Sequence, residues 1–389
     1  GSASAAMPLM GARVDKKFAI PGVDARTPLG EAAPRILLAK AEPLFALEDV
    51  ARGGADMDAV HDMRVASRRL REAMRLLAPL YPHREFRRWY RRARRVTRSL
   101  GPVRDSDVFI DAFSRLGREL ESGGRRCVAF MVGYRMGQRE HELAALNREL
   151  ATLDLAESRA SFTAVVHAIE GTAGADLPLA SFAHAAVAER AAVVFGAQPV
   201  ALEEPNTAEQ HALRIDYKRL RYAVEAFAPC YGDEFDELHA TLTAFQDALG
   251  DLHDVHIFLD MLHDPDRVAA AGRAGVTADD MAEVAALLEA RARGEFERFA
   301  AHAAAHPAEL LLPALLLPLT RLPVPARVGV PEQPASEEAP GFEGAGEVAG
   351  GSGESGDARE DAGAVPGDEV PVEAPVVVGD EPWAEGWDT

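Results

Sequence analysis

An internal repeat, offset by 150 residues, constrains the fold of this chain more than any other feature. Residues 60–82, VHDMRVASRRLREAMRLLAPLYP, return without a gap at 210–232 as QHALRIDYKRLRYAVEAFAPCYG. Further along, LGPVRDSDVFID at 100–111 returns as LGDLHDVHIFLD at 249–260. A chain that repeats whole segments at a fixed spacing is built from repeated structural units. We therefore predict two matching halves within the 389 residues.

Each repeated segment separates into two faces when it is wound as an α-helix at about 100° per residue. Apolar residues such as Leu70 and Leu220 lie on one face, and cations lie on the other. Like charges three or four residues apart repel by about 0.2–0.5 kcal/mol per pair. A cationic row that occurs twice therefore indicates an anionic ligand that offsets this repulsion. The row comprises His61, Arg64, Arg68, Arg71 and Arg75 in the first copy and His211, Arg214, Lys218 and Arg221 in the second.

Helix-forming residues dominate the chain, and no segment alternates in the manner of a β-strand. We predict an all-α fold of two tandem four-helix-type bundles. Residues 1–28 are expected to be a tag remnant and a flexible lead-in, 29–175 the first bundle and 176–324 the second. The Gly- and Pro-rich acidic segment 325–389 has few large apolar residues, so we expect it to be disordered.

Glycine and proline mark the expected helix ends. Gly101-Pro102 predicts the end of an arginine-rich helix at 84–99, followed by another helix at 104–120. We also expect separate helices at 234–249 and 252–263, a turn from Pro199 to Pro205, and a glycine-containing link at 265–277.

The net charge of −20 is unevenly distributed along the chain. Residues 331–389 carry sixteen acidic side chains against Arg359, a net of −15. Residues 61–104 hold fourteen arginines against Asp62, Glu72 and Glu85, a net of +11. The acidic average therefore does not exclude an anionic partner.

The cysteines and the apolar segments bear on the cellular location. Cys127 and Cys230 provide neither a disulfide framework nor a metal motif, which is typical of a reducing cytoplasm. The most apolar run, 308–319, contains Pro313 and is shorter than the roughly 20 residues that a membrane span needs. We expect a soluble cytoplasmic protein with no membrane partner.

Four motifs, in order, resemble the CHAD domain, a helical domain named for its conserved histidines. They are HxxRVxxRRLR, LGxVRDxDVF, HxLRxxYKRLRYxxE and FQDxLGxLxD, and the resemblance covers roughly 29–322. It implies pseudo-two-fold symmetry about a basic central cavity, binding of inorganic polyphosphate, and association with polyphosphate granules. By motif position it implies a phosphate-binding role for His61, Arg64, Arg68, Arg69, Arg71, His211, Arg214, Lys218, Arg219 and Arg221.

The residues themselves favour a compatible ligand. Arginine binds phosphate oxygens bidentately, and lysine adds a point charge. Two facing cationic rows would line a groove that suits a linear polyanion, and Arg75, Arg91, Arg95 and Arg98 are candidates to extend it. His61 and His211 are expected to act as protonated donors that respond to pH.

Other ligands and activities remain as alternatives. A nucleic acid also carries a phosphate chain, but it is less favoured because only Tyr217 and Tyr222 offer rings for base stacking. A scaffold that docks acidic protein segments is a further alternative. The chain has no glycine-rich phosphate loop and no nucleophile–base set, so we predict a binding module rather than an enzyme.

The segment around His253 and His256 raises the question of a metal site. Both histidines, with Asp251, Asp254 and His239, are of types that bind divalent cations. We expect no protein metal site and no cofactor, apart from a divalent cation that bound polyphosphate would carry. Asp105 and Asp254, which match in the two copies, are expected to orient arginines by ion pairs.

Overall fold

The computed structural model describes residues 18–47, 51, 57–153, 155–169 and 174–321. These residues form α-helices joined by short turns, and they contain no strand, which confirms the predicted all-α fold. The expected tag remnant and the expected disordered tail at 325–389 lie outside the described residues.

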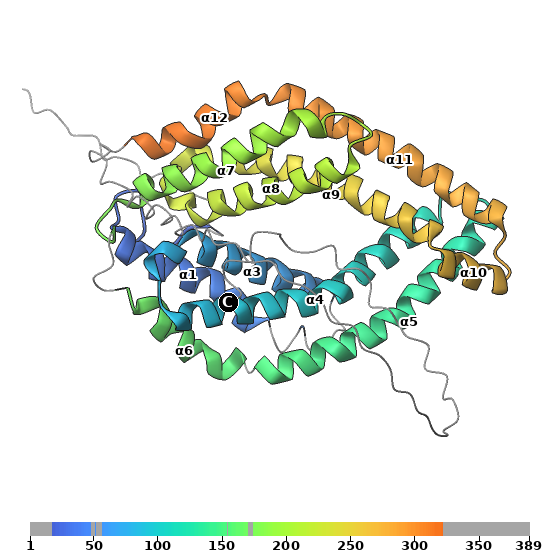
Figure 1. Cartoon of the computed structure of the whole chain (residues 1–389), viewed down its shortest axis with the longest axis horizontal. Helices are drawn as coiled ribbons and strands as arrows, with labels where there is room; N and C mark the ends of the chain where they lie inside the picture. Colours follow the sequence, from blue (N-terminus) through green and yellow to red (C-terminus); the bar gives the residue numbers. More distant parts are fainter. Residues whose placement is uncertain (1–17, 48–50, 52–56, 154, 170–173, 322–389) are drawn as a thin grey trace, which may run out of the picture. The chain divides into compact units, whose positions relative to one another are not determined.

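The helices of the second half follow those of the first along the chain (Figure 1). The first half contains α1 (Leu29–Ala46), α3 (Met57–Leu76), α4 (Arg84–Leu116), α5 (Ser122–Leu153) and α6 (Leu155–His167). The second contains α7 (Leu179–Ala201), α8 (Thr207–Ala226), α9 (Phe235–His263), α10 (Pro265–Arg273), α11 (Ala278–Ala305) and α12 (Ala308–Leu316). Short 3-10 helices occupy Ala78–Leu80, Ala228–Cys230, Gly232–Glu234 and Leu317–Thr320.

The repeated segments form α3 and α8, and each buries the predicted apolar face. Met63 and Leu70 of α3 are fully buried where that helix packs against α1 and α4. Leu213 and Leu220 of α8 are buried in the same way against α7 and α9. Burial of one such side chain stabilises the fold by about 1.5–3 kcal/mol, so the apolar stripe determines how each helix is rotated.

The two halves exchange hydrogen bonds where α1 and α7 begin. The Leu29 amide donates to the Leu177 carbonyl at 2.8 Å, and the Leu179 amide donates to the Thr27 carbonyl at 2.9 Å. Leu29 and Leu179 are 150 residues apart, and so are Thr27 and Leu177, so the two bonds join matching positions of the two halves. This reciprocity agrees with the predicted pseudo-two-fold relation, which stays a prediction for the halves as a whole.

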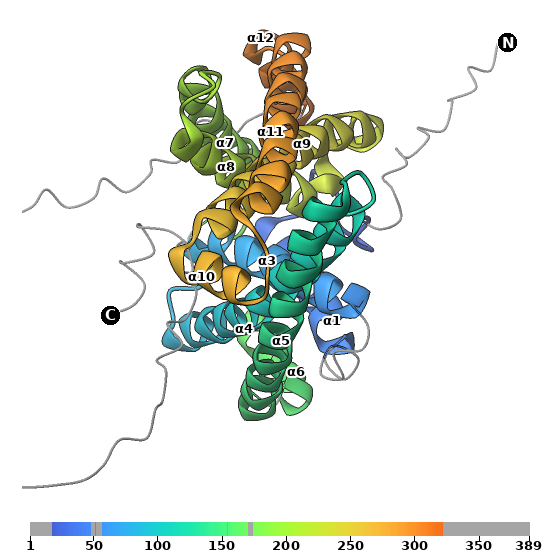
Figure 2. The same ribbon diagram turned by 90° about the vertical axis from the view of Figure 1, so that its right-hand side faces the viewer.

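At the opposite end the halves share one hydrophobic core. Phe109 and Phe113 of α4 meet Phe258 of α9, and the Phe109 and Phe258 ring centroids are 5.3 Å apart. Met131 of α5 and Val284 of α11 belong to the same cluster. Both views show α9 and α11 meeting α4 and α5 at this end (Figures 1 and 2). The predicted bundles therefore form one compact unit.

Several predicted helix ends are wrong, because α4 and α9 run through the glycines that were expected to end them. α4 contains Gly101 and Pro102, although Pro102 has no amide to bond the carbonyl one turn earlier. Buried Leu100 and Val103 flank this site, and their packing offsets the lost bond. α9 likewise continues from Phe235 to His263, α7 includes Pro199, and α10 occupies the expected link.

One described helix, α7, is long and apolar enough to cross a membrane by length and composition alone. The pair of α11 with the segment Ala308–Thr320, bent by 67°, passes the same test. α7 packs against α8 and α12 and buries Val187, Ala191 and Val194. The absence of a membrane partner stays a prediction.

Candidate functional site

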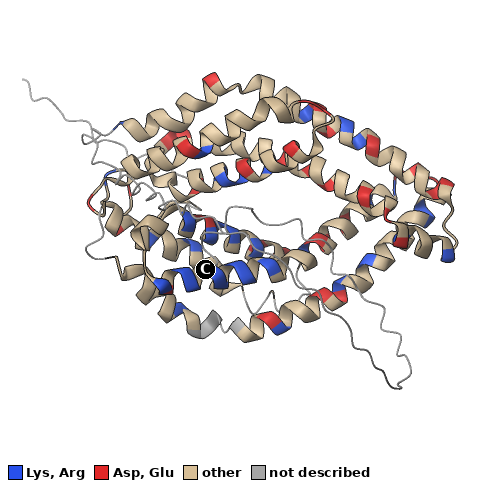
Figure 3. Ribbon diagram, viewed as in Figure 1, with Lys and Arg blue, Asp and Glu red and all other residues tan. Residues whose placement is uncertain are grey.

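The cationic rows of the two halves come together because α3 packs against α8. Arg69 of α3 donates through Nε to Oε2 of Glu225 on α8 at 2.6 Å, and the Glu225 side chain is completely buried. Figure 3 shows Lys and Arg gathered on α3, α4 and α8 where the two halves approach one another. α3 and α8, the helices that carry the two rows, therefore lie against one another in the structure.

Several of these cations form a group that we call the central cluster. Its members are close enough to influence one another electrostatically across the two halves. Arg68 of α3 lies near Arg214 of α8, and Arg104 of α4 lies near both His61 and Asp254. The central cluster comprises Arg64, Arg68, Arg104, Arg214, Lys218, His61, His211 and His253, with the carboxylates of Asp105 and Asp254.

Arg68 and Arg214, from opposite halves, are cluster arginines that repel one another. Burial lowers the pKa of the Arg214 guanidinium; Asp254 opposes this shift, and the positive charge of Arg68 adds to it. Within the described part of the chain, no carboxylate lies within ion-pair distance of Arg68. The two halves thus hold cations near one another without a matching number of carboxylates.

The two matching aspartates behave differently. Oδ1 of Asp105 lies 3.6 Å from Nη2 of Arg64, which confirms the expected ion pair for the first copy. Burial raises the pKa of Asp254 to about 6; Arg214 opposes this shift and Asp105 adds to it. A carboxyl group with this pKa is partly protonated near neutral pH, and the negative charge of the cluster falls accordingly.

The pKa values of the cluster histidines are lowered, which favours the neutral rings in the protein without ligand. Nδ1 of His211 lies 3.0 Å from Nδ1 of His253, so one ring donates a hydrogen bond and the other accepts it. Burial lowers the pKa of His253 to about 3, and the charge of Arg214 contributes. Burial also lowers the pKa of His211, and the positive charge of Arg214 lowers it further. Burial and the charge of Arg104 lower the pKa of His61 in the same way.

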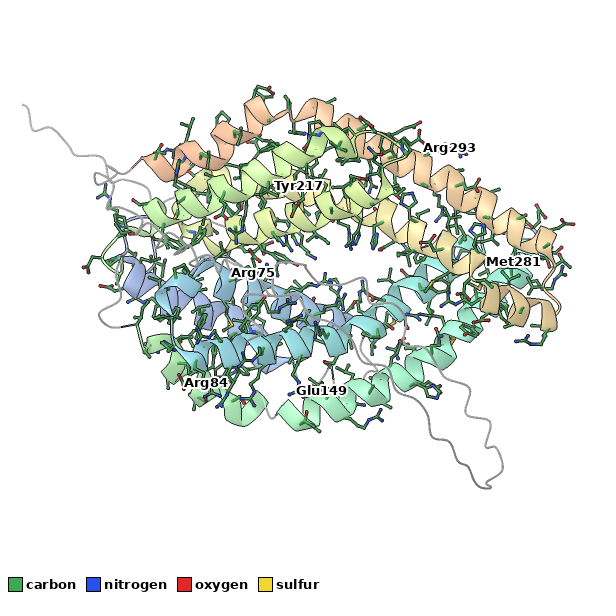
Figure 4. All side chains as sticks on the ribbon, viewed as in Figure 1. Arg75, Arg84, Glu149, Tyr217, Met281 and Arg293 are labelled. Carbon is green, nitrogen blue, oxygen red and sulfur yellow. The ribbon has the colours of Figure 1, made fainter. Side chains whose placement is uncertain are left out.

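Other predicted site arginines bond to the protein itself. Arg71 is buried with its guanidinium 5.7 Å from the centre of the Tyr90 ring. Arg75 donates to Glu72 at 3.0 Å and to the Tyr90 hydroxyl at 2.9 Å, and Figure 4 labels it where the two halves approach. Arg219 pairs with Asp216 at 3.2 Å. A role of these arginines toward a ligand stays a prediction.

The three predicted site arginines of α4 differ from one another. Arg95 pairs with Glu149 of α5, and their Nη2 and Oε1 atoms are 2.6 Å apart. Arg91 is half-buried and Arg98 is exposed. Neither of these two has an ion pair within the ranges that the structure describes.

Glu225 was not among the sequence candidates, although it organises the interface between the halves. Glu225 accepts hydrogen bonds from Arg69 and from His239 Nε2 at 2.9 Å, and it forms an ion pair with Arg221. Lys40 Nζ donates to its backbone carbonyl at 3.1 Å. Burial alone would raise the pKa of Glu225, but the hydrogen bond from His239 and the charge of Arg69 lower it to about 2. The sequence did contain a signal for Glu225, because the matching residue of the first copy is the cation Arg75.

Two glycines were also missed, because they were interpreted only as helix ends. A Cβ atom on Gly101 would lie 2.4 Å from Nη1 of Arg64. A Cβ atom on Gly250, the matching residue, would lie 3.8 Å from Nε of Arg214. The backbone of α4 therefore lies directly beneath the Arg64 guanidinium. The Leu-Gly pair occurs at the matching position of both copies, and this repetition could have identified the two glycines from the sequence.

The described residues contain no group of three or more His, Cys, Asp or Glu side chains placed to hold a metal ion. His239 bonds to Glu225 and His253 bonds to His211, so the residues considered for a metal site are divided between two clusters. Tyr217 is buried, and its hydroxyl donates to Gln198. Tyr222 is also buried, beneath Arg221, so neither ring is available to stack on a base.

Comparisons with known proteins agree with this geometry. Among solved structures, the chain is similar to the CHAD domain from the plant Ricinus communis, with 22% identity, a TM-score of 0.55, and coverage of 79% of this chain and 97% of that one. It is also similar to PptA from Streptomyces chartreusis, with 19% identity, a TM-score of 0.50, and coverage of 72% and 100%. At these identities the likeness shows the fold. No curated protein sequence matches the chain. The CHAD domain model matches residues 35–263, more than half of the 389 residues, and the chain belongs to the CHAD domain family.

Proposed function

We propose that the central cluster binds inorganic polyphosphate and that the chain thereby associates with polyphosphate granules in the cytoplasm. One observation carries the proposal: Arg68 and Arg214, from opposite halves, are close enough to repel one another, and Arg68 has no carboxylate partner within the described residues. Family membership supports the same ligand class.

The chemistry of the cluster suits a phosphate chain. Guanidinium groups bind two phosphate oxygens at once, and such bonds are stronger where water is partly excluded. A polymer with a negative charge on every phosphate would offset the repulsion between the rows from both halves. A compact anion would reach fewer of these cations.

Affinity measured against polyphosphates of graded length, in low and high salt, tests the proposal. By analogy with DNA, neutralising six to ten phosphates makes affinity fall by about 10³–10⁵ between roughly 50 and 200 mM salt. Competition with single-stranded DNA separates a preference for polyphosphate from general polyanion binding. If DNA competes equally well at each salt concentration, the proposed ligand is wrong.

Binding is expected to strengthen on acidification. The histidine pKa values are lowered in the free protein, and a bound polyanion would raise them, so binding takes up protons. Affinity should therefore rise as pH falls from 8 to 6, by up to about tenfold per pH unit for each proton taken up. The comparison is between the unmodified chain and the double variant His61→Ala, His211→Ala. If affinity depends on pH in the same way for both proteins, His61 and His211 do not take up the protons that accompany binding.

Gly101→Ala is expected to weaken binding without destabilising the fold. The added Cβ meets the tip of the Arg64 side chain, which moves at little cost, while alanine favours the helix by up to about 1 kcal/mol. Gly250→Ala is the matched control, because its Cβ meets Arg214 at an ordinary contact distance. Affinity and thermal unfolding of both variants are measured. Equal affinities would show that the position of Arg64 is unimportant.

We further propose that the chain is a binding module and does not process the polymer. Incubation with polyphosphate and Mg²⁺, followed by gel analysis of chain length, tests this directly. Time-dependent shortening would overturn it. For granule association, a fluorescent fusion is compared with the same fusion carrying Arg68→Gln and Arg214→Gln, and equal localisation would argue against recruitment through the cluster.

A further inference from the structure

The matching helices α4 and α9 carry opposite charge on their solvent-facing sides. The Glu-Phe pair at the start of α4 returns where the 3-10 helix Gly232–Glu234 meets α9, and the two phenylalanines, Phe86 and Phe235, are buried. This match aligns the two helices with an offset of 149 residues. In that alignment Arg84 of α4 corresponds to Asp233 of the 3-10 helix before α9, and Arg87, Arg88 and Arg98 correspond to Asp236, Glu237 and Asp247 of α9.

Four of the α4 arginines are exposed or half-buried and have no ion pair among the described residues. Arg84, Arg88 and Arg98 are exposed and Arg91 is half-buried. None of the four has an ion pair within the part of the chain that the structure describes. Between residues 84 and 98 the only acidic residue is Glu85. Like charges at this spacing destabilise a helix, so α4 retains them at a cost in stability.

Arg84, Arg88, Arg91 and Arg98 form a stripe along α4 that leads to the central cluster. Arg84, Arg91 and Arg98 are spaced by seven residues, which keeps them on one side of a helix with a drift of about 20° per step. The next position in this series is Asp105, which pairs with Arg64 in the cluster. At about 1.5 Å per residue, the stripe extends roughly 30 Å from the cluster along α4.

The corresponding side of α9 would repel the same ligand. Asp233, Asp236, Glu237 and Asp247 are all exposed. A polyanion that leaves the cluster therefore meets positive charge over α4 and negative charge over α9. A long phosphate polymer that extends beyond the cluster is therefore attracted by α4 and repelled by α9.

We infer that a phosphate polymer bound at the central cluster continues over α4 alone, where Arg84, Arg88, Arg91 and Arg98 bind its further phosphates. This inference rests on the proposed function. It adds the direction in which the polymer leaves the central cluster and a dependence of affinity on polymer length. Tripolyphosphate would occupy the cluster only. A long chain would occupy both the cluster and the α4 stripe.

The test compares two variants that lose the same charge. One carries Arg84→Gln, Arg91→Gln and Arg98→Gln. The control carries Arg118→Gln, Arg273→Gln and Arg293→Gln, which are exposed positions outside the stripe; Figure 4 labels Arg84 on α4 and Arg293 on α11. Affinities for tripolyphosphate and for long-chain polyphosphate are measured for each variant and for the unmodified chain.

The stripe variant should lose about tenfold in long-chain affinity, as expected for three weak surface contacts, and should keep its tripolyphosphate affinity within about twofold. The control should keep both. Equal loss in the two variants, or an unchanged long-chain affinity in the stripe variant, would show that the stripe does not bind the polymer. Neither result would contradict binding at the central cluster. An unmodified chain that binds neither ligand would instead overturn the proposed function.

Discussion

A variant carrying Arg64→Gln, Arg68→Gln, Arg214→Gln and Lys218→Gln is expected to lose polyphosphate affinity by about 10³-fold at physiological salt. Removing four phosphate contacts at about 1 kcal/mol each amounts to about 4 kcal/mol, and each 1.4 kcal/mol is tenfold. The dependence of log affinity on log salt should become shallower by about 3. Titration at several salt concentrations measures both quantities.

The control for this variant removes the same charge elsewhere. Arg26, Arg118, Arg273 and Arg293 are exposed, and their replacement by Gln should leave affinity within a few-fold. Helix content by circular dichroism shows whether each variant folds. Arg68→Gln alone, which breaks no ion pair in the described residues, should lose about fivefold, or about 1 kcal/mol. Loss of the same size in cluster and control variants would mean that binding is non-specific.

Replacement of the buried Glu225 by Gln is expected to destabilise the fold by about 3–5 kcal/mol. Arg69, Arg221 and Lys40 would remain close together in the interior without the carboxylate that offsets their charge. Glu149→Gln is the matched control, since it removes the partner of the half-exposed Arg95 and should cost at most about 1 kcal/mol. Urea unfolding gives both free energies of unfolding.

The contribution of Glu225 should also depend on pH. Its pKa is about 2 in the folded protein and about 4.5 when unfolded, so folding favours the ionised form. The resulting stability is present in full above about pH 4.5 and is lost as pH falls toward 2. The gap in unfolding free energy between the unmodified chain and Glu225→Gln should narrow over this range. A gap that stays constant down to pH 3 would contradict the ionic role of Glu225.

These expectations divide the predicted arginines into two groups with different roles. Arg64, Arg68 and Arg214 belong to the cluster to which we assign the ligand. Arg69 and Arg221 bond to Glu225 and hold α3 against α8. We therefore assign ligand binding to Arg68 and positioning to Arg69, its neighbour in the same motif. The spacing of the cations in the cluster depends on the internal pair.

Much of the architecture was predictable because it is encoded locally. The 150-residue repeat indicated two halves, and the helical periodicity of Leu70 and Leu220 indicated which faces are buried. The cationic rows followed from the same pattern. These features depend on residues within a few helical turns of one another.

Other features depend on contacts between residues far apart in the chain, and local patterns contain no record of them. Gly101 and Pro102 resemble a helix end, but tertiary packing of Leu100 and Val103 carries α4 through them. Arg69 resembles Arg68 in the sequence, and only Glu225, 156 residues away, distinguishes their roles. A charge becomes a ligand site or a structural bond according to which partner the fold places beside it, and that choice is made between elements rather than within one.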